Sequence, residues 1–114
     1  MPYLSVTTNK AVAADKTESV LDLLSKKLSK SLGKPENYVM VEFRHNRALI
    51  FAGSADPAAY VELKSIGLPA VQVRPLSKLL CGILEEELQI DPARIYIEFV
   101  EAKGSHWGWN GSTF

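Results

Sequence analysis

The first residues that could do chemistry stand at the start of the chain, Met1-Pro2-Tyr3. If Met1 is removed, Pro2 becomes a free secondary amine, and an unperturbed α-amino group titrates near ~8, close to neutral pH. Because burial among apolar side chains disfavours the charged form, a buried Pro2 amine would titrate lower and could act as a general base. The commoner interpretation is a terminus without a catalytic role. With Met1 attached, the Pro2 nitrogen is an amide nitrogen and is not basic.

A second candidate is Lys34, which lies between Gly33 and Pro35. Pro35 biases Lys34 toward extended conformations and places it on a short, stiff connection between a helix and a strand. An ammonium group there could hold the negative end of a substrate on which Pro2 acts as a base. On the residues alone, the commoner interpretation of Lys34 is a solvated loop lysine. The commoner role of the aromatic residues is packing.

The composition limits the class of protein. The chain has 114 residues, of which 46% are hydrophobic and 23% charged, and this predicts a single globular domain over residues 1–114. Lys+Arg and Asp+Glu both number 13, so the net charge of zero argues against a nucleic-acid partner. Cys81 is the only cysteine, so no internal disulfide is expected, and with two histidines beside it no zinc-ligand set can be assembled.

The chain shows no sign of a membrane or export segment. No apolar run approaches the ~18 residues of a membrane-spanning helix, and no basic segment with an apolar core precedes Leu4. We therefore expect no membrane partner and no signal peptide. The expected location is the cytoplasm, with secretion by a route that needs no signal peptide as the alternative.

Hydrophobic spacing predicts the helices and strands that would position these candidates. Residues 14–32 carry apolar side chains at helical spacing, Gly33 is typical of a helix C-terminus, and Asp15 with Glu18 is expected to cap the helix start. A second helix is predicted at residues 71–89. Strands are expected at residues 3–8, 38–43, 58–66 and 95–100, with a further short strand at 48–51.

The order strand–helix–strand occurs twice, which predicts an α+β fold of two βαβ units. Right-handed crossovers would place both helices on one face of a four-stranded mixed sheet. The opposite face is half apolar, with Tyr96, Glu98 and Val100 on one strand, and we expect a closed oligomer to cover it. Sites at the subunit borders would be lined by Tyr96, Glu98 and the aromatic tail, residues 104–114.

Five short stretches follow one another in a specific order along the whole chain. They are Met1-Pro2, Gly33-Lys34-Pro35, Ser65-Ile66-Gly67, residues 77–82 (SKLLCG) and residues 109–114 (WNGSTF). Together they resemble the macrophage migration inhibitory factor family of the tautomerase superfamily. The resemblance implies the double βαβ fold in a homotrimer, with three sites at subunit interfaces and no need for a cofactor or metal.

The resemblance also implies an activity, keto–enol tautomerisation of α-keto acids such as phenylpyruvate or of dopachrome-type compounds. Pro2 corresponds to the family's catalytic base, which takes a proton from the carbon next to the carbonyl and returns it at the other end of the enol. Lys34 corresponds to the carboxylate-binding lysine, and Ile66 to an isoleucine that donates a backbone N–H. Tyr38 matches an active-site tyrosine, and Tyr96 a wall residue supplied by a neighbouring subunit.

The other substrate-binding positions implied by the resemblance include three departures from the family pattern. The matching positions are Trp109, Phe114 and Ser65, and the departures are Glu98 for an asparagine of vertebrate members, Trp107 for a small aliphatic residue and Lys64 for a histidine. A carboxylate at Glu98 would repel a second anionic group on a substrate and favour a protonated Pro2. These changes bear on substrate preference.

Two functions stay open at this point. The first is an enzyme, which the intact set of Pro2, Lys34 and Ile66 favours. The second is a cytokine-type interaction protein whose trimer surface engages a receptor or another protein, with weak or vestigial tautomerase activity, and the altered Glu98 and Trp107 leave room for it. A ferredoxin-like regulatory domain that binds a small ligand ranks below both.

Overall fold

Strand β1 (Tyr3–Thr8) lies inside the sheet and buries its alternate residues Leu4, Val6 and Thr8 on the helix side. Its neighbours are β2 (Met40–Arg44), which is parallel to it, and β3 (Ala59–Ile66), which is antiparallel. Strand β4 (Ile95–Ala102) pairs in parallel with β3 and completes the order β2-β1-β3-β4. The computed structural model describes all residues, 1–114, and confirms the predicted four-stranded mixed sheet.

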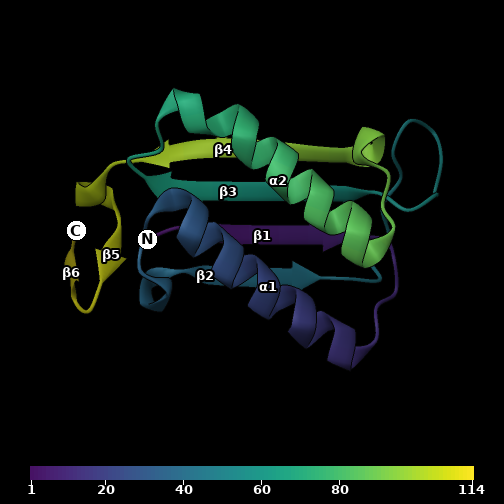
Figure 1. The fold of residues 1–114 in the computed structure, drawn as a ribbon, viewed down its shortest axis with the longest axis horizontal. Coiled ribbons are helices and arrows are strands. Elements are labelled where there is room, and N and C mark those ends of the chain that lie inside the picture. The colour runs from purple at the N-terminus through teal and green to yellow at the C-terminus, as the bar shows by residue number, and fades with distance from the viewer.

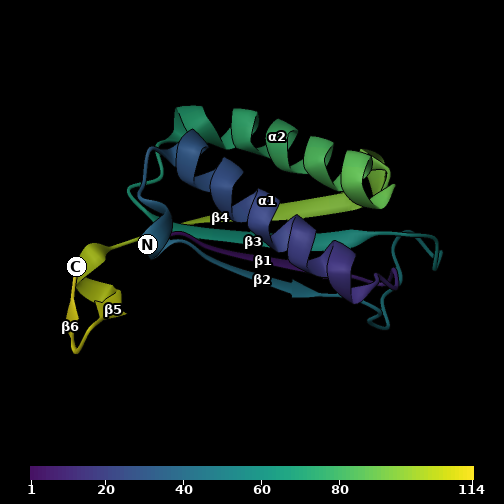
Figure 2. The same cartoon turned by 60° about the horizontal axis from the view of Figure 1, so that its bottom comes forward.

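Both helices, α1 (Ala14–Leu32) and α2 (Ala70–Leu88), cover the same face of the sheet (Figures 1 and 2). They run in opposite directions, since each crosses back between two parallel strands and the two βαβ units are joined by the antiparallel β1–β3 pair. Gly33 ends α1 in the left-handed region with φ +63°, as its position in the sequence predicted. The predicted bounds of α1 are confirmed, and those of α2 differ by one residue at each end.

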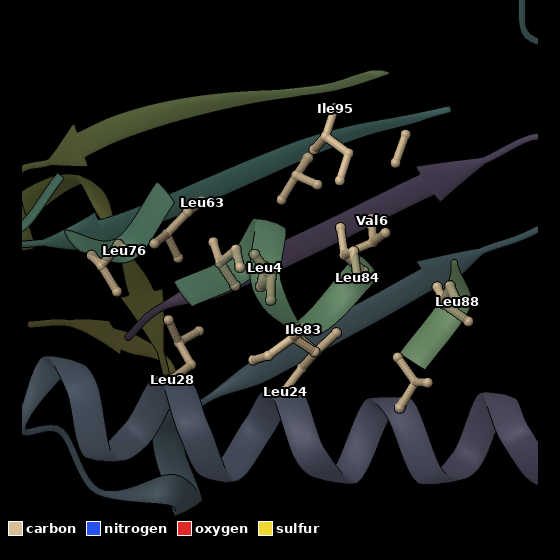
Figure 3. Packing of buried hydrophobic residues seen from close by; sticks show 14 of the residues in the cluster. Leu4, Val6, Leu24, Leu28, Leu63, Leu76, Ile83, Leu84, Leu88 and Ile95 are labelled. Carbon is tan, nitrogen blue, oxygen red and sulfur yellow. The ribbon is translucent and has the colours of Figure 1, made fainter. Parts of the chain in front are cut away.

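The hydrophobic core lies between the helices and the sheet. It is one cluster of 17 buried residues, to which every long element except β2 contributes buried side chains. Figure 3 shows Leu4 and Val6 of β1 facing side chains of the two helices, among them Leu28 of α1 and Leu84 of α2. This core fixes the strand order, and the strand order places the N-terminus between the ends of β2 and β3.

Three local predictions were wrong. β2 begins at Met40 instead of residue 38, because Glu36–Tyr38 forms a 3₁₀ turn after Pro35. Residues 48–51 form no strand, since no other strand of this chain lies beside them and only an isolated Phe51–Ser54 bridge is made. Asp15 does not cap α1: the N-cap is Ala13, and the Asp15 carboxylate accepts from the backbone N–H of Lys16 in the first turn.

The C-terminal tail leaves the sheet after β4 and turns toward the N-terminus. A 3₁₀ turn at Gly104–His106 leads into a small hairpin of β5 (Gly108–Trp109) and β6 (Ser112–Thr113). In Figures 1 and 2 this yellow hairpin projects beyond the sheet, at the same end as the label N. Neither α1 nor α2 combines the length and the hydropathy that crossing a membrane requires.

Candidate active site

Pro2 is buried at the point where the chain enters β1. Its carbonyl accepts a hydrogen bond from the Met40 N–H at 3.0 Å, so the residue before the strand is already tied to β2. The amino group of Met1 donates to the Tyr38 carbonyl at 2.6 Å. The start of the chain is therefore held by β2 and by the 3₁₀ turn before it, and it does not fray into solvent.

A cavity of about 270 Å³ adjoins this buried terminus. Its lining is mainly apolar and comes from three parts of the chain that are distant in sequence. The lining residues are Met1, Pro2, Tyr3, Asn37, Tyr38, Val39, Met40, Trp107, Gly108, Trp109 and Phe114. The structure thus brings five of the predicted site residues together in one place: Pro2, Tyr38, Trp107, Trp109 and Phe114.

Aromatic contacts close one side of this cavity. Tyr38 meets Trp109 edge to face with ring centroids 5.4 Å apart, and Phe114 in the same way at 5.7 Å. Trp109 and Phe114 stack on each other at 5.5 Å. The Phe114 N–H also donates to the Trp107 carbonyl at 3.2 Å. Because such pairs favour a defined geometry, Tyr38 anchors the tail hairpin beside the terminus.

The electrostatic environment of the terminus disfavours positive charge. Burial, and then the nearby positive charge of Lys34, lower the pKa of the Met1 amino group below that of an ordinary α-amine. Partial burial also lowers the pKa of the Lys34 ammonium. That ammonium donates a hydrogen bond to the Ile66 carbonyl at the end of β3. Lys34, Ile66 and the terminus therefore form one neighbourhood.

Three predicted residues of β3, Lys64, Ser65 and Ile66, are not among the lining residues of the cavity, and neither is Lys34. Ser65 is fully buried on the helix side of the sheet, and its hydroxyl donates to the Ile66 carbonyl at 3.3 Å. Lys64 lies on the open side, opposite Tyr3 in the sheet register. Both positions adjoin Ile66, and neither contributes to the wall of the cavity in this chain.

Tyr96 and Glu98 lie farther away, toward the other end of the sheet. Tyr96 pairs with Tyr60 of β3, and Tyr60 pairs with Thr7 of β1. Thr7 lies four residues along β1 from Tyr3, which is about 13 Å at the usual rise per residue. The Tyr96 side chain is 65% exposed. In one copy of the chain, these two predicted wall residues do not reach the cavity beside Pro2.

Comparisons with known proteins bear on this arrangement. The family model for macrophage migration inhibitory factor (MIF) matches residues 1–114. The chain belongs to the MIF family. A MIF from Meriones unguiculatus is 41% identical over 115 residues, covering 100% of this chain and 99% of the relative. The crystal structure of a MIF homologue from Prochlorococcus marinus has a TM-score of 0.93 and 42% identity, covering 98% of each chain.

A nematode relative is similarly close, since the MIF homolog of Brugia malayi is 40% identical over 116 residues, with 100% and 99% coverage. The fold of this chain, two helices on a four-stranded mixed sheet, is the fold of the MIF homologue from Prochlorococcus marinus. No group of three or more His, Cys, Asp or Glu side chains is placed to hold a metal ion.

Four residues of the cavity carry no chemical signal of their own in the sequence. Asn37, Val39, Met40 and Gly108 line the cavity beside residues that the MIF resemblance did mark. Their signal in the sequence is adjacency alone, because each directly flanks or lies within two residues of Tyr38 or an aromatic residue of the tail. Tyr3 joins the lining because it follows Pro2, and its hydroxyl donates to Glu42 of β2 at 2.5 Å.

Proposed function

We propose that this MIF-family protein is a keto–enol tautomerase of phenylpyruvate-type α-keto acids, with Pro2 as general base once Met1 is removed. One observation carries the proposal: Pro2 is buried beside a mainly apolar cavity, and burial and Lys34 lower the pKa of the adjoining Met1 amino group, an environment that the Pro2 amine would share once Met1 is removed. Membership of the MIF family supports the same reaction class. Dopachrome-type compounds are further candidate substrates.

The proposed chemistry moves one proton between carbon and oxygen. The neutral Pro2 nitrogen takes a proton from the carbon next to the carbonyl, and the resulting Pro2 ammonium returns it to the enol oxygen; ketonisation runs the same steps in reverse. A lowered pKa keeps more of the amine neutral near pH 7, which a base requires. General-base catalysis of this kind contributes about 10²–10⁴ in rate.

Lys34 is proposed to bind the substrate carboxylate. An ammonium has three donor hydrogens, and one of them is used by the Ile66 carbonyl, so two are left for an anionic oxygen. The backbone N–H of Ile66 is proposed to add a further donor. The phenyl ring of the substrate would pack in the aromatic lining formed by Tyr38, Trp109 and Phe114.

We also infer that the working unit is a homotrimer, in which Tyr96 and Glu98 reach the cavity of a neighbouring subunit. Both side chains are exposed and lie away from the cavity of their own chain. The sheet face that they share carries large exposed apolar groups such as Met40 beside charged ones. Assembly through this face would cover it and would complete the wall of each site.

The second candidate function is a cytokine-type interaction protein. The names of the relatives describe an effect on macrophage migration, and this favours a protein partner for the present chain as well. In addition, the Pro2 nitrogen is an amide while Met1 is attached, so a form that keeps Met1 would lack the proposed base. Such a form would serve as an interaction protein only.

The test starts by showing with mass spectrometry that Met1 is absent from the purified protein. Phenylpyruvate ketonisation is then followed by ultraviolet absorbance for the wild type and for Pro2→Gly, which keeps an amine at the terminus but loses the pyrrolidine ring. We expect kcat/KM to fall by about 10²-fold or more in Pro2→Gly, within the range of general-base catalysis. Equal rates above the uncatalysed rate would remove Pro2 from the mechanism, and a wild-type rate equal to the uncatalysed one would leave the interaction protein as the better function.

A further inference from the structure

Phe51 packs against Tyr96, although the two residues come from different parts of the chain. Phe51 lies in the connection between β2 and β3, and Tyr96 near the start of β4. Their rings meet edge to face, with centroids 4.8 Å apart and planes at 65°. This is a preferred geometry of aromatic pairs. The family motifs do not include Phe51, and the hydrophobic pattern placed it only in the strand wrongly predicted at residues 48–51.

Arg94 also packs on the Phe51 ring. Its guanidinium carbon lies 5.3 Å from the centre of the Phe51 ring, which is the geometry of a cation–π contact. The same guanidinium donates to the carbonyls of Pro57 at 3.0 Å, and of Ser54 and Asp56 at 3.1 Å each. Arg94 directly precedes β4 and lies two residues before Tyr96, so these contacts connect the β2–β3 connection to the start of β4.

A second polar anchor fixes the same connection. The Asn9 side-chain amide donates to the carbonyls of Leu49, Ala55 and Asp56, and its oxygen accepts from the Ala58 N–H. In Figure 1 this connection is the teal loop at the right, beside the end where β4 begins. The loop that carries Phe51 is therefore held at several points, although it contains no strand.

Tyr96 needs such support because its side chain is largely exposed on the open face of the sheet. An exposed side chain keeps its rotamer freedom, and this freedom must be lost when the ring becomes the wall of a binding site. A neighbour that already selects one orientation reduces the entropic cost of binding. Phe51 contacts the Tyr96 ring in this way.

We propose that Phe51, supported by Arg94, is a positioning residue that fixes the Tyr96 ring for the substrate site of the neighbouring subunit. The inference rests on the proposed tautomerase function and on the proposed trimer. It assigns to the β2–β3 connection a role in substrate binding, although that connection lies at the end of the sheet remote from Pro2 in its own chain.

The test compares Phe51→Leu with the wild type, both without Met1, in the ketonisation of phenylpyruvate. We expect KM to rise roughly three- to tenfold with little change in kcat, because an aromatic pair of this kind contributes that much to orientation. Phe51→Tyr keeps the ring and should restore the wild-type KM. Phe43→Leu removes the same ring from β2, away from Tyr96 and the cavity, and should leave KM unchanged.

A second readout does not depend on activity. In protein labelled with 3-fluorotyrosine and assigned through Tyr96→Phe, the ¹⁹F resonance of Tyr96 should shift in Phe51→Leu and stay in place in Phe43→Leu. Light scattering should give Phe51→Leu the same assembly state as the wild type, and a changed assembly would show a structural role instead. A wild type without activity would overturn the proposed function, and with it the role of Tyr96. An active wild type with an unchanged KM or an unshifted resonance in Phe51→Leu would overturn the role of Phe51 alone.

Discussion

Replacing Lys34 by methionine would separate the two effects that we assign to its charge. Methionine keeps much of the apolar length of the side chain but has no donor and no charge. The Lys34 ammonium gives one of its three hydrogens to the Ile66 carbonyl, so the substrate carboxylate can take two. Losing hydrogen bonds to a charged group costs about 1.5–3 kcal/mol, so kcat/KM should fall about ten- to 150-fold, mainly through KM.

The same variant should move the pH dependence of the reaction. The base works as the neutral amine, so the rate rises with pH as the terminal amine loses its proton. Burial and the charge of Lys34 both lower the pKa of an amine at this terminus, and Lys34→Met removes the second cause. The acidic limb of kcat/KM should therefore move to higher pH, toward the value of an ordinary α-amine.

The assay is steady-state phenylpyruvate ketonisation across the neutral pH range, with Lys30→Met as matched control. Lys30 is an exposed lysine in the last turn of α1, the helix that ends just before Lys34, and it does not contribute to the lowered pKa of the terminus. The control should keep the wild-type KM and pH profile. If Lys34→Met also kept both, Lys34 would not bind the carboxylate and the proposed geometry of the site would be wrong.

Two further predictions follow from the packing. Leu84→Ala should lower the free energy of unfolding by about 2–5 kcal/mol in denaturant titrations, because Leu84 is 1% exposed at the centre of the core and the remaining space cannot refill completely; a loss below about 1 kcal/mol would contradict the packing described. Tyr38→Leu removes both edge-to-face contacts to the tail, each worth about 0.5–1.5 kcal/mol, so the tail should loosen. The measurement is the fluorescence of Trp107 and Trp109, and unchanged spectra and quenching would show that Tyr38 does not hold the hairpin.

Much of the fold could be predicted from local patterns. The bounds of α1 follow from apolar residues at helical spacing and from Gly33, whose positive φ suits a helix end. Both helices on one face follow from the order of elements and from the handedness of the crossovers. The segment 48–51 shows the limit of this reasoning, because a strand forms only where a second strand is available for its hydrogen bonds.

The candidate site was harder to predict, because its parts come from both ends of the chain. Residues that could act as a base or bind an anion, such as Pro2 and Lys34, could be named from their types and neighbours in the sequence. No local pattern shows that the Tyr38 ring contacts the rings of Trp109 and Phe114, or that Lys34 donates a hydrogen bond to the Ile66 carbonyl. Those contacts depend on which strands pair and where the tail folds back.

Residue types and their periods are properties of the chain at short range, so they were enough for the helices, for the two βαβ units and for a candidate base and its partner lysine. The cavity, the lowered pKa of the terminus and the support of Tyr96 by Phe51 depend on distances between segments far apart in the sequence. Such distances are set by strand pairing and core packing, which no short window of residues contains.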